Sequence, residues 1–173
     1  EHNSETFFKG IMKLPPGHFM TFSMDGKLNI QSYWHLEDEI KITKKNEIKD
    51  AFFDLLEQVI DWECRSDVPV GILFSGGLDS SILLHLMAQN LGKQVEAFSY
   101  NFPGKYDQTE FMSNVIKDID VRHHISTLSA KDFLNDFSNT MWFQEEPTGS
   151  ITMTAFKNVF EQIHNRNVGV VLS

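Results

Sequence analysis

The run Ser75-Gly76-Gly77-Leu78-Asp79-Ser80-Ser81 contains the residues of this chain that are best suited to chemistry. Glycines allow a backbone to turn tightly and to approach a ligand closely. The serines supply hydroxyl donors, and a helix that starts after such a turn offers unpaired N–H groups and a positive dipole end, both of which favour anions. Asp79 adds a carboxylate, which suits a Mg²⁺ ion that accompanies phosphate groups. The run therefore predicts a phosphate-binding loop.

Two widespread phosphate-binding motifs do not fit this run. A Walker A loop ends in Gly-Lys-Ser/Thr, which is absent here, and the dinucleotide fingerprint needs a third glycine. The run instead resembles the Ser-Gly-Gly-x-Asp-Ser signature of the PP-loop ATP pyrophosphatases, which hold the β- and γ-phosphates while a substrate attacks the α-phosphate. A strand-to-helix turn that binds no ligand is the alternative that these residues leave open.

The loop lies between two elements that must position it. Residues 68–74 have the apolar pattern of a buried strand, and the residues after the loop have the period of a helix. From residue 47 onward helical and strand patterns alternate, which predicts an α/β fold with a parallel sheet and helices on both faces. Ligands of such sheets bind beyond the carboxyl ends of the strands. Further strands are expected at residues 95–100, 122–125 and 168–172.

Apolar residues at helical spacing predict which side chains face the sheet. The stripes are Ile48, Phe52, Leu55, Leu56 and Val59; Ile82, Leu83, Leu86 and Met87; Phe111, Met112, Val115, Ile116 and Ile119; Phe133, Leu134 and Phe137; and Met153, Phe156, Val159, Phe160 and Ile163. Phe53 is also expected in the core. Gly92 is expected to end the second helix, Asp107 and Glu110 have the spacing of a capping box, and Ser129 is expected to start the fourth helix.

Residues 1–36 differ from the rest. Strands expected at residues 18–23 and 28–34 flank the sequence Met24-Asp25-Gly26-Lys27, and Asp-Gly is typical of a hairpin turn. Because a two-stranded hairpin is only marginally stable alone, these strands should belong to a larger sheet that this chain does not supply. The polar residues 36–46 are interpreted as a linker.

Composition and charge limit the class of protein. The chain has 173 residues, of which 41% are hydrophobic and 23% charged, as in an ordinary globular protein. Its net charge of −9 disfavours a nucleic-acid partner, which requires a basic surface. The single cysteine, Cys64, excludes an internal disulfide, fits a reducing compartment and is interpreted as a packing residue. No membrane span or signal peptide is recognisable, so a cytoplasmic location is expected, and the missing initiator methionine suggests a longer parent chain.

Several segments outside the loop stand in the order and spacing of one family. They are Phe8-Lys9-Gly10-Ile11-Met12-Lys13-Leu14-Pro15-Pro16-Gly17-His18, Tyr33-Trp34, Arg65-Ser66-Asp67-Val68-Pro69-Val70-Gly71, Gln144-Glu145-Glu146-Pro147 and Val170-Val171-Leu172-Ser173. With these segments the chain closely resembles the glutamine-hydrolysing asparagine synthetases. The resemblance implies that residues 1–36 end an amidotransferase domain. Residues 37–173 would form the first half of the synthetase domain, with the adenine nucleotide alpha hydrolase-like fold.

The resemblance also implies a reaction and its site residues. ATP would bind with Mg²⁺, the side-chain carboxylate of aspartate would attack the α-phosphate, and ammonia released from glutamine would then displace AMP to give asparagine. Pyrophosphate and metal would be held by Ser75, Gly76, Gly77, Leu78, Asp79, Ser80 and Ser81, with Ser75 and Asp79 as catalytic residues and Asp79 on the metal. Leu73, Tyr100 and Ser173 would contact adenine and ribose. Expected partners are the missing amidotransferase domain and C-terminal half, and a homodimer is a further expectation.

The chain departs from the family pattern in several places. Tyr100 replaces a small aliphatic residue and could stack on the base or cap the sheet, and the cap is favoured. Asp107-Gln108 stands where the family has an acidic pair. The Gly-Glu-Gly-x-Asp-Glu motif that follows Ser173 in the family and the N-terminal cysteine nucleophile of the amidotransferase are both absent. The 173 residues alone are therefore expected not to make asparagine.

Two other groups invite a functional interpretation. His123 and His124 are adjacent, so on a strand they would point to opposite faces and make poor joint metal ligands; one is expected buried and one exposed. The pair Glu145-Glu146 precedes a predicted helix and could either be a solvated turn or lie near the second substrate.

Three alternative functions remain open at this point. β-Lactam synthetases and peptide cyclases share the two-domain plan but act on other acyl groups. The lysidine synthetases and other tRNA-modifying enzymes share the loop, although their RNA would require a positive surface. A non-catalytic nucleotide-binding module is the third alternative.

Overall fold

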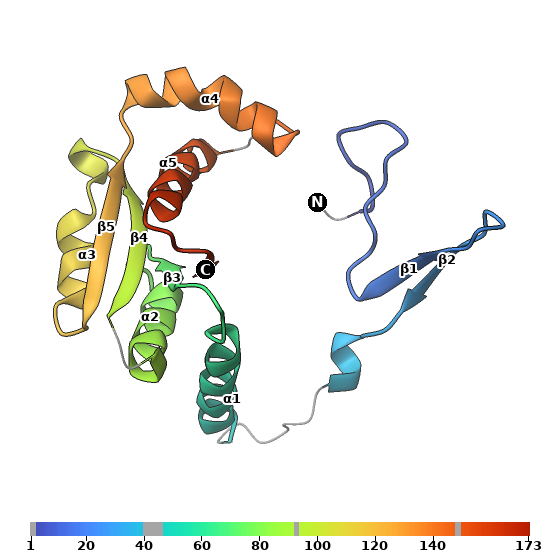
Figure 1. Ribbon diagram of the computed structural model, residues 1–173, viewed down its shortest axis with the longest axis horizontal. Helices are drawn as coiled ribbons and strands as arrows, with labels where there is room; N and C mark the ends of the chain where they lie inside the picture. Colours follow the sequence, from blue (N-terminus) through green and yellow to red (C-terminus); the bar gives the residue numbers. More distant parts are fainter. Residues whose placement is uncertain (1–2, 40–46, 92–93, 148–149) are drawn as a thin grey trace. The chain divides into compact units, whose positions relative to one another are not determined.

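The structure is a computed structural model that describes residues 3–39, 47–91, 94–147 and 150–173. It contains two compact units, residues 1–51 and residues 52–173, which are described separately (Figure 1). In the described ranges, no helix has both the length and the apolar character needed to cross a membrane.

The first unit contains the predicted hairpin. Strand β1 (His18–Phe22) pairs antiparallel with β2 (Leu28–Ser32), with Phe22 opposite Leu28. The turn between them uses Gly26 at a φ of 83°, and the Gly26 N–H donates to the Ser23 carbonyl at 2.9 Å. The Asp-Gly turn prediction is thus confirmed. A short 3-10 helix, η1 (Leu36–Glu39), lies in the stretch interpreted as a linker, whose remaining residues 40–46 lie outside the described part.

The second unit has alternating helices and strands, and its first helix begins four residues before the boundary between the units. These elements are α1 (Ile48–Glu63), β3 (Val70–Leu73), α2 (Leu78–Leu91), β4 (Val95–Asn101), the 3-10 helix η2 (Gly104–Tyr106), α3 (Thr109–Ile116), β5 (Val121–Thr127), α4 (Ala130–Gln144), α5 (Ile151–Asn165) and β6 (Val170–Leu172). The strands form one parallel sheet in the order β5-β4-β3-β6, which confirms the predicted parallel sheet. Gly92, the predicted C-terminal cap of α2, lies outside the described residues.

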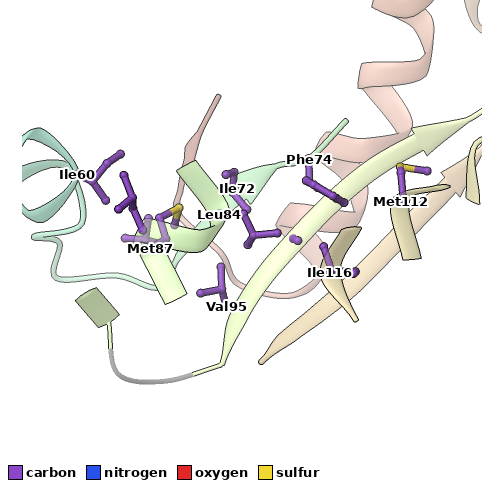
Figure 2. Packing of buried hydrophobic residues seen from close by; sticks show 11 residues of the cluster. Ile60, Ile72, Phe74, Leu84, Met87, Val95, Met112 and Ile116 are labelled. Atoms are coloured by element: carbon purple, nitrogen blue, oxygen red, sulfur yellow. The ribbon is translucent and has the colours of Figure 1, made fainter. Parts of the chain in front are cut away.

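Helices cover both faces of this sheet, as predicted. On one face, Ile72 and Ala97 of the sheet belong to a core cluster that residues of three helices complete. These residues are Ile60 of α1, Leu84 and Met87 of α2, and Met112 and Ile116 of α3 (Figure 2). Strand residues of the opposite parity face α5 instead, where Phe98 packs with Val159 and Ile163. Successive side chains point to opposite faces of a strand, so each face of the sheet has its own hydrophobic core. The carboxyl ends of the strands lie between the two cores.

Several side chains predicted to face inward lie at the surface. On α1 the contacting residues are Leu56 and Ile60, and Cys64, which directly follows the helix, continues their four-residue spacing. The exposed apolar residues that were expected in the core are Ile48, Phe52, Phe53, Leu55, Val59, Phe111, Leu134, Met153 and Phe160. The spacing of apolar residues predicts which face of a helix is apolar. How much of that face is buried depends on how closely the neighbouring elements pack against it.

The start of α4 follows the prediction. Ser129 is its N-cap: the Asp132 N–H donates to Ser129 Oγ at 3.2 Å, and the Ser129 N–H donates to the Asp132 carboxylate at 3.1 Å. Hydrogen bonds from Ser129 to this carboxylate lower the pKa of Asp132. This reciprocal capping box satisfies two donors that would otherwise be unpaired.

The capping box predicted for α3 is wrong. The N-cap is Gln108, and its side chain makes no cap hydrogen bond. Asp107 instead accepts from the Thr109 N–H at 2.9 Å and from the Thr109 hydroxyl, and these bonds lower the pKa of the Asp107 carboxyl. An aspartate can form such a local turn two residues along the chain, and this turn competes with helix capping.

Candidate functional site

A cavity of about 410 Å³ lies at the carboxyl ends of the strands in the second unit. Its lining residues come from β3, β4, α2, α5, the loop that precedes α2, Gln108 and Ser173, which follows β6. Six residues of the predicted site line it: Leu73, Ser75, Asp79, Ser80, Tyr100 and Ser173. The structure thus brings together residues that are up to 100 positions apart, between Leu73 and Ser173. Gly76, Gly77, Leu78 and Ser81 complete the loop without lining the cavity.

The two glycines of the loop have different roles. Gly76 has a φ of 78°, a conformation that side-chain-bearing residues rarely adopt, and a Cβ there would meet Met112 Cγ at 3.0 Å and Phe111 Cε1 at 3.1 Å. Gly77 has no positive φ, and a Cβ there would meet only Ser75 Oγ, at 3.3 Å. Glycine is therefore required at position 76 for two independent reasons, whereas position 77 is more tolerant.

Serine hydroxyls close the loop on itself. The Ser75 N–H donates to Ser80 Oγ at 3.2 Å, and the two hydroxyl oxygens lie 3.0 Å apart. The Gly77 N–H donates to Ser75 Oγ at 3.3 Å. Ser81 Oγ donates to the Gly77 carbonyl at 2.6 Å, so its only proton supports the loop. Ser75 is exposed at the cavity, and its hydroxyl can be redirected toward a ligand.

Backbone donors gather at the start of α2. In the part of the chain that the structure describes, the N–H groups of Gly76, Leu78 and Asp79 donate no hydrogen bond. These groups stand at the N-terminus of a helix of 14 residues, where the dipole is positive. Unpaired donors and a positive dipole end together favour an anion with several oxygens, such as a phosphate group.

Asp79 supplies a carboxylate to this anion-favouring loop. It is exposed in the first turn of α2 and lines the cavity. Among the described residues, no three His, Cys, Asp or Glu side chains come together as a metal site. Mg²⁺ commonly binds one or two carboxylates together with substrate phosphates and water. A single carboxylate beside a phosphate loop therefore fits a Mg²⁺ ion that enters with the nucleotide, and does not fit an ion held by the protein alone.

Tyr100 stands between two cavities. Its ring makes edge-on contacts with Phe102 and Phe156, with ring centroids 5.4 Å and 5.3 Å apart. It lines the 410 Å³ cavity and also a neighbouring cavity of about 590 Å³, and Gln108 lines both as well. This packing against protein rings supports the interpretation of Tyr100 as a cap at the sheet end rather than as a platform for a base.

The two adjacent histidines lie on opposite faces of the sheet, as predicted. The His123 ring contacts Phe74, and its Nε2 lies 2.7 Å from Ser99 Oγ, whereas His124 contacts Phe98 and its Nε2 donates to the Glu96 carboxylate at 2.5 Å. The expectation that one of them is exposed is wrong, because helices cover both faces: His124 is buried and His123 half-buried. Burial and the neighbouring His124 lower the pKa of His123.

The acidic pair after α4 lies outside the 410 Å³ cavity. Glu145 caps the C-terminus of α4 at a φ of 55°, and its N–H donates to the Met141 carbonyl at 3.0 Å. Gln144 lines a larger cavity of about 910 Å³ between α4 and α5, which also borders Ser173. The pair therefore forms a helix-ending turn, and its predicted place near a second substrate stays a prediction.

Sequence reasoning did not assign several lining residues to the site, among them Phe156 and Ser99. Phe156 of α5 lines the 410 Å³ cavity, although its helical spacing assigned it to the core. Ser99 of β4 also lines the cavity and was not singled out. Its position one residue before Tyr100, at the end of a predicted strand, was the one available signal.

Cys64 should react slowly with alkylating reagents. Burial, followed by the nearby charges of Asp61 and Glu63, raises the pKa of its thiol, so less thiolate is present at any given pH. Iodoacetamide at pH 8 should therefore modify Cys64 several times more slowly in the folded chain than in the same chain in urea, as followed by mass spectrometry. Equal rates would contradict the assignment of Cys64 as a packing residue.

Comparison with known proteins agrees with the position of the site. Residues 51–173 match the family model described as asparagine synthase. The chain is 32% identical over 171 residues to a protein of Methanocaldococcus jannaschii named asparagine synthetase 2 (glutamine-hydrolyzing), covering 97% of this chain and 33% of that protein. Asparagine synthetase 3 of Bacillus subtilis is 28% identical over 155 residues, covering 81% of this chain and 25% of that protein.

Another relative has a different name. Amidase chry2 of Gibberella zeae is 23% identical over 190 residues, covering 99% of this chain and 28% of that protein. The chain thus spans about a third or less of the length of these relatives. The matched residues 51–173 include the whole loop and all strands of the parallel sheet. The chain therefore belongs to the asparagine synthase family, as the motifs predicted.

Proposed function

We propose that this chain forms the nucleotide-binding part of an ATP-dependent amide-forming synthetase, with aspartate as the acyl substrate. The observation that carries the proposal is the set of unpaired N–H groups at the start of α2, next to the Asp79 carboxylate. These groups are suited to donate hydrogen bonds to phosphate oxygens. Membership of the asparagine synthase family and two relatives named asparagine synthetase support the choice of reaction.

In this proposal the loop acts on the leaving group. A carboxylate oxygen of the substrate attacks the α-phosphorus, the bond to the bridging oxygen breaks, and pyrophosphate leaves with the electron pair. The N–H groups of Gly76 and Leu78 and the hydroxyl of Ser75 stabilise the charge that develops on it. A Mg²⁺ ion held by Asp79 would add positive charge at the same place. Leu73, Tyr100 and Ser173 would surround the adenosine part.

The second half of the reaction uses ammonia. Its nitrogen attacks the acyl carbon of the adenylate, and AMP leaves with the electron pair of the broken carbon–oxygen bond. We assign residues 1–36 to the end of a glutamine amidotransferase domain that would supply the ammonia, and residues 37–173 to the first half of the synthetase domain. The described part of the hairpin exposes Phe22 and Leu28, which agrees with strands that normally belong to a larger sheet.

Calorimetry on the chain itself tests the nucleotide site. ATP with Mg²⁺ and pyrophosphate with Mg²⁺ should both bind, and the chain should make no asparagine from ATP, aspartate and ammonia. Failure of both ligands to bind would contradict the phosphate loop. Production of asparagine would contradict the assignment of residues 37–173 as only part of the synthetase domain.

A longer version with the length of the relatives tests the acyl substrate. Exchange of labelled pyrophosphate into ATP should depend on aspartate. Exchange that depends on another carboxylic acid would instead favour a different acyl substrate, and would group the protein with the relative named amidase or with other amide-forming synthetases. Nucleotide binding without pyrophosphate exchange for any acid would favour a non-catalytic nucleotide-binding module. A salt-sensitive complex with tRNA would favour the RNA-modifying alternative.

A further inference from the structure

The peptide bond between Phe74 and Ser75 joins strand β3 to the phosphate loop. Phe74 follows the last residue of β3 and is buried. Its N–H donates to the Phe98 carbonyl at 2.8 Å, and its carbonyl accepts a hydrogen bond from the Ser99 hydroxyl. Strand β4 thus contacts both sides of Phe74: the Phe98 carbonyl accepts from its N–H, and the Ser99 hydroxyl donates to its carbonyl.

The direction of each proton in this contact follows from chemistry. A carbonyl oxygen can only accept, so the single hydroxyl proton of Ser99 is directed to Phe74. The second contact of Ser99 Oγ is His123 Nε2 at 2.7 Å, and the hydroxyl has no proton left for it. His123 must therefore donate from Nε2 to Ser99. With the pKa of His123 lowered, the ring is neutral near pH 7, which leaves Nδ1 without a proton.

This chain of hydrogen bonds ends in the loop. The Phe74 carbonyl and the Ser75 N–H belong to one planar trans peptide and point in opposite directions. Fixing the carbonyl toward Ser99 therefore fixes the Ser75 N–H, which donates to Ser80 Oγ at 3.2 Å. Ser80 in turn lies in the first turn of α2, at the unpaired N–H groups.

We propose that His123 and Ser99 are positioning residues that hold the Phe74–Ser75 peptide and so keep the phosphate loop in its binding shape. The pair acts from β5 and β4 through hydrogen bonds and is assigned no contact with the reacting atoms. The proposal rests on the proposed function only in the statement that the loop binds phosphates. Its geometric part, the direction of the protons and the hold on the loop, stands on the contacts alone.

The chain offers matched controls on the other face of the sheet. Ser126 of β5 is a buried serine like Ser99, but its hydroxyl has no hydrogen-bond partner among the residues that the structure describes. His124 is next to His123, but it pairs with Glu96. Side-chain alternation places Ser126 and His124 on the face of the sheet opposite to His123. Substitutions at Ser126 and His124 therefore change similar residues without touching the loop.

The tautomer is tested first, by ¹⁵N NMR of the histidine ring in the chain. Nε2 of His123 should carry the proton and Nδ1 should not. The same spectra should show faster exchange of the Ser75 amide in Ser99→Ala and in His123→Leu, with no change in Ser126→Ala. A proton on Nδ1 alone, or equal exchange in all variants, would overturn the proposal.

Binding of pyrophosphate with Mg²⁺ tests the consequence. Loss of the hydrogen bond to the Phe74 carbonyl should weaken binding about five- to tenfold in Ser99→Ala. His123→Leu should weaken binding similarly, and His123→Gln, whose amide retains an N–H donor, should restore most of it. Ser126→Ala and His124→Gln should stay within about twofold. Should Ser99→Ala not fold, the His123→Leu and His123→Gln pair decides the same question.

The outcomes separate this proposal from the proposed function. If the unaltered chain binds no pyrophosphate but Ser75 exchange responds to Ser99→Ala and His123→Leu and not to Ser126→Ala, the positioning role stands and the phosphate function fails. If the chain binds pyrophosphate with equal affinity in Ser99→Ala and Ser126→Ala, the positioning role is wrong and the phosphate function stands.

Discussion

Replacing Gly76 by valine should abolish the affinity of the chain for ATP with Mg²⁺. Position 76 has a φ of 78°, which costs a side-chain-bearing residue about 1–2 kcal/mol and a β-branched residue more. A Cβ would also press against Met112 and Phe111 at 3.0–3.1 Å, and overpacking of this kind costs about 1–3 kcal/mol. Together these costs predict a loss of affinity of roughly 100-fold or more, measured by calorimetry.

Gly77→Ala is the matched control for this prediction. Position 77 has no positive φ, and the nearest atom to an added Cβ is Ser75 Oγ at 3.3 Å. A loss of less than about tenfold is expected, because a small shift of one hydroxyl relieves the contact. A thermal unfolding curve for each variant separates loss of the loop from loss of the fold. Unchanged nucleotide affinity in Gly76→Val would contradict the assignment of residues 75–81 as a phosphate-binding loop.

Replacing Asp79 by asparagine should remove the dependence of nucleotide binding on Mg²⁺. The carboxylate is exposed, so its loss should leave the fold intact. Asparagine keeps the shape but lacks the negative charge that a hard cation requires. In the chain, ATP affinity should become the same with and without Mg²⁺. In a longer version with the length of the relatives, adenylation should fall by about 10²- to 10³-fold, because charge on the leaving pyrophosphate is no longer neutralised.

A second acidic residue at a helix start serves as the control. Asp50 lies in the first turn of α1, as Asp79 does in α2, but it takes no part in the loop. Asp50→Asn should leave Mg²⁺ dependence and exchange unchanged. In the longer protein, Asp79→Asn should also leave glutamine hydrolysis intact, because that reaction belongs to the other domain. Full aspartate-dependent pyrophosphate exchange in Asp79→Asn would contradict the assignment of this carboxylate.

Much of the fold was predictable because its signals are local. Each strand of the parallel sheet was expected within a few residues of its observed place, since a buried strand is a short continuous apolar run between turn residues. The hairpin turn at Gly26 and the N-cap at Ser129 were predictable for the same reason: one or two residues determine the backbone conformation. The failed capping box at Asp107 shows the limit, because a competing turn of equal reach was available.

The candidate site divides in a similar way. The amino-acid sequence by itself determined the loop, its place between a strand and a helix, and the family, because these depend on residue types at fixed spacing along the chain. Only the tertiary structure decided that Gly76 and not Gly77 is crowded, since Phe111 and Met112 reach it from another helix. It also decided that Ser99, from the next strand, donates to the first peptide of the loop and that His123, from a further strand, contacts Ser99. Such contacts depend on the register and packing of elements distant in sequence, and no local pattern encodes them.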